Sequence, residues 1–174
     1  MMATKLNLGC NTRILKGYTN IDFTAYHGVD IVTDVSKLGM YGDNSVDVIR
    51  ASHILEHFAT KRTAGILKEW YRALKPDGLL YLSVPDWERI VSAYVSGGLG
   101  DWVINSLYGD QGYDGAEHKT VFDERRLRDY LGKAGFSDIS RVEILPDTPI
   151  GECSTNKGSW DGKLVSLNLI CVKG

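Results

Sequence analysis

Residues 5–22 read KLNLGCNTRILKGYTNID, and this stretch decides the fold. Lys5–Leu8 is a short apolar run that ends in Gly9. A second β-like run, Tyr18–Ile21, ends in the carboxylate Asp22. A glycine lets the backbone approach a ligand because it has no Cβ, and an acid at a strand tip can accept hydrogen bonds from a ribose diol. The stretch therefore predicts a site for an adenosine-containing cofactor; the alternative is an ordinary strand-to-helix turn.

The link between these two runs is too short for the usual connection of parallel strands. A parallel crossover normally needs a dozen residues or more and includes a helix. Gly9 and Asp22 are 13 positions apart, whereas the usual dinucleotide fold places the acid about 20 residues on. We therefore expect the first crossover helix to be shortened or missing. The sheet should then be covered there by other parts of the chain or by a second copy in a homo-oligomer.

Two further strand ends carry polar residues. Asp34 follows the run Asp30–Thr33, and Ala51, Ser52 and His53 follow the run Val46–Arg50. Because the carboxyl ends of parallel strands meet at one edge of the sheet, we expect these residues to share the cofactor cleft. There Asp34 is placed to accept a hydrogen bond from an adenine amino group, beside the backbone of Val35. The alternative is a turn or helix N-cap aspartate.

His53, Glu56 and His57 form an H-x-x-E-H pattern, the order found in inverzincins. No third ligand is identified, and the surrounding sequence predicts a strand end rather than a long helix. We therefore expect no metal site. One of the two histidines is interpreted as lining the cleft and the other as a hydrogen-bonded structural residue.

Composition limits the classes of protein to consider. The 174 residues fit one domain, and a net charge of -2 does not favour bulk nucleic-acid binding. Cys10, Cys153 and Cys171 are widely spaced and are interpreted as free thiols in a reducing compartment. No apolar run is long enough for a membrane span or a signal-peptide core, so we expect a cytoplasmic protein without a membrane partner.

The second half of the sequence predicts helices around a closing hairpin. Lys61–Leu74 has helical periodicity, and a buried strand, Leu79–Val84, follows it. A further helix is predicted between an N-cap at Asp123 and a stop at Gly135. Two last strands are expected at residues 139–145 and 164–172. The link between them is too short and polar for a crossover helix, so they should pair antiparallel.

Residues 87–117 are the least regular part of the sequence. They contain two weak helical stretches, 89–95 and 101–107, separated by glycines. Because this segment follows a strand end at the cofactor edge, we interpret it as a lid-like insertion that forms the substrate wall. An aromatic lining is expected from Trp87, Tyr94, Trp102, Tyr108 and Tyr113. The alternative is a plain insertion whose aromatic residues belong to the core.

Taken in order, these pieces resemble a class I S-adenosylmethionine-dependent methyltransferase of the type 11-like kind. The matching pieces are LNLGC (6–10), GYTNID (17–22), DIVTDVSKL (30–38), SVDVIRASHILEHF (45–58), LKEWYRALKPDGLLYLSVPD (67–86) and HKTVFDERRLRDYLGKAGF (118–136). The resemblance implies a single Rossmann-like α/β domain over residues 1–174. Its seven-stranded sheet should be mostly parallel, with the last strand antiparallel. One departure is Asn11, which occupies the second glycine of the usual loop; asparagine tolerates positive φ better than most residues.

The resemblance also implies roles for single residues. Leu8, Gly9, Cys10 and Asn11 would line the methionine end of S-adenosyl-L-methionine, and Asp22 would hold its ribose. The other residues implied to contact the cofactor are Asp34 and Val35 at adenine, and Ala51, Ser52 and His53 near the sulfonium.

Methyl transfer needs a base only where the acceptor carries a proton, and His53 and His118 are the candidates. We therefore expect methyl transfer to a small-molecule or glycan acceptor, with a hydroxyl as one option. Two alternatives stay open at this point: a nicotinamide-dependent oxidoreductase and a non-catalytic protein that binds S-adenosylmethionine.

Overall fold

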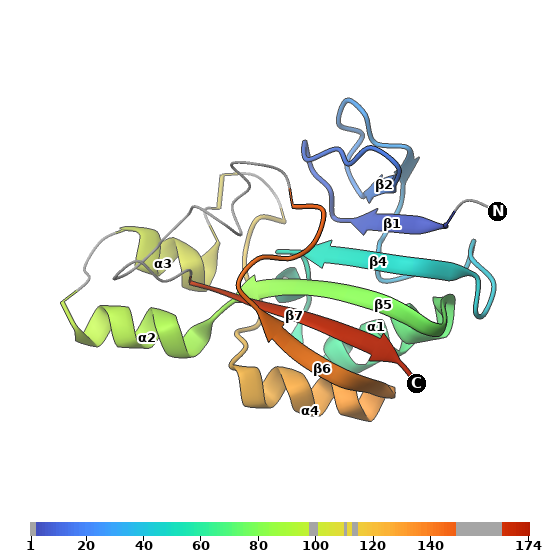
Figure 1. The fold of residues 1–174 in the computed structure, drawn as a ribbon. Helices are drawn as coiled ribbons and strands as arrows, with labels where there is room; N and C mark the ends of the chain where they lie inside the picture. Colours follow the sequence, from blue (N-terminus) through green and yellow to red (C-terminus); the bar gives the residue numbers. More distant parts are fainter. Residues whose placement is uncertain (1–2, 98–100, 110, 113–114, 149–164) are drawn as a thin grey trace.

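One seven-stranded sheet, in the order β3-β2-β1-β4-β5-β7-β6, forms the centre of the molecule (Figure 1). The computed structural model describes residues 3–97, 101–109, 111–112, 115–148 and 165–174. The strands are β1 (Lys5–Leu8), β2 (Thr19–Asp22), β3 (Ile31–Val32), β4 (Val46–Ser52), β5 (Leu74–Pro85), β6 (Phe136–Val142) and β7 (Ser166–Lys173). The helices are the 3-10 turn η1 (Leu55–His57), α1 (Thr60–Ala73), α2 (Trp87–Val95), α3 (Asp101–Tyr108) and α4 (Glu124–Ala134).

The pairing of the strands confirms the predicted sheet. β1 pairs in parallel with β2 and β4, β2 with β3, and β4 with β5. β7, the last strand of the chain, is antiparallel to both of its neighbours, β5 and β6. The carboxyl ends of β1, β2, β4 and β5 therefore meet at one edge, which is where a cofactor binds in such sheets.

The first crossover helix is missing. Residues 9–18 connect β1 to β2 through turns, and residues 23–30 and 33–45 also contain no helix. The cover expected in its place comes from the chain itself. Leu15 and Tyr18 of the first loop pack with Val48, Tyr81 and Leu145 in a small apolar cluster on that face. A homo-oligomer stays a prediction.

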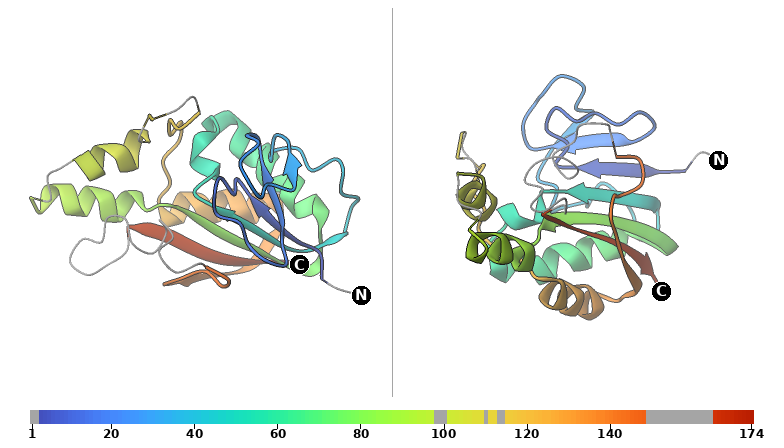
Figure 2. Two further views of the ribbon diagram at one scale, coloured as in Figure 1. Left: turned by 90° about the horizontal axis from the view of Figure 1, so that it is seen from above. Right: turned by 60° about the vertical axis from the view of Figure 1, so that its left-hand side comes forward.

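The long helices α1 and α4 lie together on the opposite face of the sheet (Figure 2). α1 buries Thr63, Ile66, Leu67, Trp70 and Ala73. The apolar periodicity predicts a buried face of Ala64, Leu67, Trp70, Tyr71 and Leu74. Only Leu67 and Trp70 belong to both sets, so the buried face of the helix is rotated from the predicted one. Within the part of the chain that the structure describes, no helix is both long and apolar enough to cross a membrane.

α4 begins and ends where the sequence predicts. The Asp123 carboxylate accepts a hydrogen bond from the backbone N–H of Arg126, at 2.6 Å, and so caps the helix. Gly135 ends it with φ of 110°, a left-handed conformation that favours glycine. The chain enters β6 directly from this turn, so β6 begins at Phe136 and not near the predicted Ile139.

β5 is longer than predicted because it begins directly at the end of α1. Leu74 already pairs with Val46, and the regular register starts only where Leu79 pairs with Val48. The four residues between them bulge out of the ladder, with Asp77 at φ of 59°. The proline and glycine of Lys75-Pro76-Asp77-Gly78 predict a turn that ends the helix, but the structure makes these four residues a bulge inside the strand.

Candidate active site

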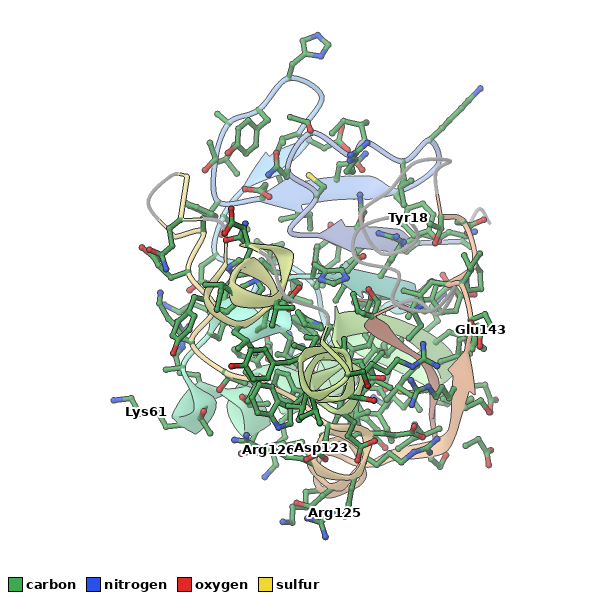
Figure 3. All side chains as sticks on the ribbon, turned by 90° about the vertical axis from the view of Figure 1, so that its left-hand side faces the viewer. Tyr18, Lys61, Asp123, Arg125, Arg126 and Glu143 are labelled. Atoms are coloured by element: carbon green, nitrogen blue, oxygen red, sulfur yellow. The ribbon has the colours of Figure 1, made fainter. Side chains whose placement is uncertain are left out.

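A cavity of about 1240 Å³ opens at the carboxyl edge of the parallel strands. Figure 3 views the molecule from this edge. Residues that follow β1, β2, β3 and β4 line the cavity on the sheet side. Its other side is lined by Asn105, Ser106, Gly109, Gly115, Ala116, His118 and Lys119. Eight of the ten residues predicted to contact the cofactor lie at its wall: Gly9, Cys10, Asn11, Asp22, Asp34, Val35, Ser52 and His53.

The glycine turn has the backbone that the sequence predicts. Gly9 has φ of 64° and Asn11 has φ of 47°, so asparagine does adopt the positive φ expected at the second position. A Cβ on Gly9 would lie 2.6 Å from Cγ1 of Ile54, a contact that no side chain can make. The backbone N–H groups of Gly9 and Cys10 donate to the carbonyl of Ile21, which fixes the turn against β2.

The Asp22 carboxylate is held rigidly beside this turn. One oxygen accepts from the backbone N–H of Asn11 at 2.8 Å, and the other accepts from that of Thr24 at 2.9 Å. Each oxygen keeps a further lone pair, and the residue lines the cavity although it is only 4% exposed. The carboxylate is therefore placed to accept the hydrogen bonds of a diol.

Cys10 follows the end of β1 and Asp34 follows the end of β3, while Asp22 ends β2, which lies between them in the sheet. Burial and the carboxylate of Asp22 raise the pKa of the Cys10 thiol to about 12, so this wall is neutral. Burial raises the pKa of Asp34, but hydrogen bonds from Ser36 and from Arg62 outweigh it and lower the pKa overall. Asp34 also accepts a hydrogen bond from the Ser36 N–H at 3.0 Å. It therefore acts as a turn aspartate as well, which was the alternative interpretation from the sequence.

Three histidines surround one buried glutamate on the β4 side of the cavity. The carboxylate of Glu56, which is fully buried, lies 3.1 Å from Nδ1 of His53. Nε2 of His53 lies 3.0 Å from Oγ of Ser166. The rings of His57 and His118 meet edge to face with their centroids 4.9 Å apart. All three histidines line the cavity, whereas the sequence predicted that one of the pair His53 and His57 is structural.

The pKa values of Glu56 and His118 are both shifted, for different physical reasons. Burial raises the pKa of Glu56, but the hydrogen bond with His53 and the nearby histidine rings lower it overall. Burial lowers the pKa of His118, so this imidazole stays neutral at physiological pH. The group therefore combines a buried carboxylate with a neutral imidazole that faces the cavity.

Two predicted residues do not reach the cavity. The side chains of Leu8 and Ala51 are fully buried in the core beneath α1, on the opposite face of the sheet. Alternation along β1 and β4 turns them away from the neighbours that do reach it. Residues that the sequence interpretation missed include Asn7, Arg50 and Ser166, all of which line the cavity. Glu56 was noted within the H-x-x-E-H pattern but was given no role at the site. Asn7 and Arg50 could have been found from the sequence, because each is a polar residue inside an otherwise apolar strand.

Described residues of the segment 87–117 form part of the wall, but Trp87, Tyr94 and Tyr108 are not among them. Asn105, Ser106 and Gly109 face the cavity from α3 and the turn after it. Tyr94 and Tyr108 are instead more than half exposed. Trp87 does not line the cavity either. The side chains of Trp102 and Tyr113 lie outside the described residues, so their place in the lining stays a prediction.

The sequence matches a family described as "Methyltransferase domain" over residues 7–82. It is also 33% identical, over 156 residues, to a highly reducing polyketide synthase from Aspergillus nomiae. That match takes in 87% of this chain and 6% of the synthase, so the chain spans only a small part of that relative's length.

Several solved structures with a similar fold are methyltransferases. An S-adenosylmethionine-dependent methyltransferase from Archaeoglobus fulgidus is 15% identical, with a TM-score of 0.63 over 98% of this chain and 86% of that one. The 1,6-didemethyltoxoflavin-N1-methyltransferase from Burkholderia thailandensis, solved with its substrate and S-adenosylhomocysteine, is 16% identical, with a TM-score of 0.60 over 98% of this chain and 71% of that one. Together with the strand order and the turn at Gly9, the family match over residues 7–82 indicates a methyltransferase domain with the fold of class I S-adenosylmethionine-dependent methyltransferases, and it implies S-adenosyl-L-methionine as the cofactor.

Proposed function

We propose that this chain transfers the methyl group of S-adenosyl-L-methionine to a hydroxyl oxygen of a small-molecule or glycan acceptor. The observation that carries the proposal is the convergence of Gly9, Asp22 and His53 on one cavity. Ligand pockets usually measure about 300–1,000 Å³. A cavity of about 1240 Å³ therefore leaves room for an acceptor beside the cofactor.

Each contact with the cofactor has a physical basis in this arrangement. Gly9, Cys10 and Asn11 would border the methionine end, Asp22 would accept from the ribose hydroxyls, and Val35 would lie against adenine. Asp34 would reach the adenine amino group only by sharing its carboxylate with Arg62, which lies 3.3 Å away. Ser52 and His53 would lie nearest the sulfonium.

His53 is the base that the geometry favours. Its Nδ1–H donates to the buried carboxylate of Glu56, which leaves the lone pair on Nε2. This lone pair faces the Ser166 hydroxyl at 3.0 Å, so the acceptor hydroxyl would take the place of that contact. In the reaction, Nε2 takes the hydroxyl proton and the acceptor oxygen forms a bond to the methyl carbon. The electron pair of the carbon–sulfur bond would remain on the cofactor sulfur, so that S-adenosylhomocysteine would be the product. The Glu56 carboxylate then stabilises the imidazolium that forms. His118 is the second candidate, because its neutral ring also faces the cavity.

The segment 87–117 is proposed as the lid over the acceptor. It supplies cavity wall from Asn105 and Ser106. Its turns contain Gly97, Gly109 and Gly115, all at positive φ, which suits hinges.

Calorimetry with S-adenosylhomocysteine tests the cofactor site first. We expect Asp22→Asn to weaken binding by about tenfold or more, because charge-assisted hydrogen bonds are lost. Asp129→Asn, which changes an exposed carboxylate on α4, is the matched control and should bind like the unaltered protein. Binding of NAD in place of S-adenosylhomocysteine would overturn the proposal.

Methyl transfer from labelled S-adenosylmethionine, offered to sugars, phenols and polyketide-type molecules, tests the chemistry. His53→Gln should keep cofactor affinity and lower turnover by about 10²–10⁴-fold. Unchanged turnover would remove the base role of His53. Cofactor binding without any labelled product from a lysate would favour the non-catalytic alternative.

A further inference from the structure

Glu56, His57 and His118 form a cluster that the proposed reaction does not use in full. One carboxylate oxygen of Glu56 and one ring nitrogen of each histidine all lie within 4.8 Å of one another. The H-x-x-E-H pattern of the sequence lacked a third ligand. The fold supplies it, because the chain returns after α3 and brings His118 beside His57.

Both histidine rings are oriented as metal-binding histidines usually are. Nδ1 of His57 lies 3.2 Å from the backbone carbonyl oxygen of Glu117, and Nδ1 of His118 lies 3.1 Å from that of Ser106. A carbonyl oxygen only accepts, so Nδ1 carries the hydrogen in each ring and Nε2 carries a lone pair. Donation from the second ring nitrogen to a backbone carbonyl is the common support of a histidine ligand.

Glu56 provides an independent indication that something positive belongs here. Its side chain is fully buried, and one oxygen is held by His53. The other oxygen, Oε2, has no hydrogen-bond partner among the described residues. A buried carboxylate oxygen without a donor is costly, and the two neighbouring imidazoles offer lone pairs rather than N–H groups. Among the described residues, no donor therefore reaches Oε2 at the point where these three side chains meet.

We propose that Glu56, His57 and His118 bind a divalent first-row transition metal ion, for which Zn²⁺ is the best-suited probe. Two imidazole nitrogens and one carboxylate oxygen are an established catalytic zinc set. Ligand atoms at bond lengths of about 2.1 Å in a tetrahedral site lie about 3.4 Å apart, so each atom has to move by less than about 1 Å. His57 and His118 line the cavity while Glu56 lies behind them, so the fourth position faces the cavity.

Such a site would also define the acceptor more closely, and this step rests on the proposed function. An ion at the cavity wall would bind an acceptor through a hydroxyl or enol oxygen and lower the pKa of that group. His118 would then be a ligand rather than a base, which leaves His53 to take the proton.

Titration of the untagged protein with Zn²⁺ tests the site, because binding needs neither an acceptor nor turnover. We expect one equivalent to bind. His57→Ala and His118→Ala should each weaken binding by at least about 100-fold, more than is typical for loss of a supporting residue alone. His27→Ala is the matched control, since His27 is the fourth histidine of the chain, is exposed and does not line the cavity.

Two results would overturn the proposal: no binding of Zn²⁺ to the folded protein, or binding of unchanged affinity in both histidine variants. Circular dichroism of each variant checks that it folds. If the variants do not fold, Co²⁺ added to the unaltered protein decides, because tetrahedral nitrogen and oxygen ligation gives visible absorption without a thiolate band. No such absorption, or a thiolate band from Cys10, would count against the site. Methyl transfer at an unchanged rate without bound metal would reject the role of the ion in acceptor binding while leaving the proposed function intact.

Discussion

The two faces of the sheet are built in different ways, although the same strands form both. On the face covered by α1 and α4 the strands contribute apolar side chains such as Leu6, Leu8 and Ile49, all fully buried. On the other face the same strands contribute Asn7, Asn20 and Arg50, which are also almost fully buried. In Figure 3, Lys61 of α1 lies on the helix-covered side of the sheet, and Tyr18 and Glu143 lie on the other side.

The difference follows from what covers each face. A helix satisfies its own backbone hydrogen bonds and needs only apolar contacts beneath it. A loop does not, and the loop 9–18 replaces the missing crossover helix. Buried side-chain amides form hydrogen bonds with the loop backbone instead. Nδ2 of Asn7 donates to the carbonyl of Arg13, and Oδ1 of Asn20 accepts from the N–H of Leu15 at 2.8 Å. Asn20 also donates to the carbonyl of Leu15.

This polar layer has a functional consequence. The loop that Asn7 and Asn20 hold is the one that begins with Gly9 and Asn11 at the cofactor end of the cavity. In a fold with a full crossover helix, packing would fix that turn. Here a small hydrogen-bond network does so, and cofactor affinity should depend on it.

The largest expected effect lies on the helix-covered face. Trp70→Ala should lower the free energy of unfolding by about 3–5 kcal/mol, because it empties the centre of the core. Trp70 is fully buried, and its Nε1–H donates to the carbonyl of Val35 at 2.9 Å. Urea unfolding followed by circular dichroism measures the change.

Trp70→Phe separates packing from the hydrogen bond in this experiment. It keeps an aromatic ring and loses the donor to Val35, so it should be less destabilising than Trp70→Ala. Equal losses in the two variants would mean that the hydrogen bond, and not the packing of the core, stabilises this face.

The apolar periodicity of the sequence was enough to predict this face and the sheet. Helical spacing identified α1, and a buried apolar run identified β5, because both patterns depend only on neighbours in the chain. The rotation of the α1 stripe and the bulge before Leu79 were not predictable in the same way. They depend on how α1 meets α4 and on the pairing of Leu74 with Val46, which are contacts between distant segments.

The loop-covered face gives the next largest effect. Asn20→Leu keeps the side chain's approximate size but removes the oxygen that accepts from the backbone N–H of Leu15 and from Nδ2 of Asn7. We expect a loss of about 2–3 kcal/mol, since buried groups left unsatisfied cost about 1–3 kcal/mol each. S-adenosylhomocysteine affinity should fall as well, because the loop that carries Asn11 loosens. A neutral or stabilising result in urea unfolding would show that this face is an ordinary apolar core.

The candidate site was predictable only where a motif marked a strand end. Gly9, Asp22, Asp34 and His53 each follow a recognisable run, so the topology of a parallel sheet brought them together. His118 was predicted from resemblance alone. Glu56 was seen in the motif, but its burial and its central place between three histidines required the return of the chain after α3, which no local pattern specifies.

The smallest effect concerns the bond that fastens the loop after β6 to the loop-covered face. The Tyr18 hydroxyl donates to Asp147 at 2.7 Å, and this bond, with the charge of Lys5, lowers the pKa of the Asp147 carboxyl. A lowered carboxyl pKa stabilises the folded state above the ordinary value of about 4, and this contribution is lost as the pH falls through the lowered value. Because the Asp147 side chain is 48% exposed, solvent screening keeps the gain below about 1 kcal/mol.

Tyr18→Phe should therefore destabilise the protein slightly at pH 7, and the difference from the unaltered protein should shrink well below pH 4. Urea unfolding at both pH values measures it. Asp147→Asn provides the control, because adding Tyr18→Phe to it should then show no dependence on pH. A difference that stays constant with pH would mean that Tyr18 acts through packing against Val48 and Tyr81 alone, and that this face too is stabilised mainly by apolar contacts.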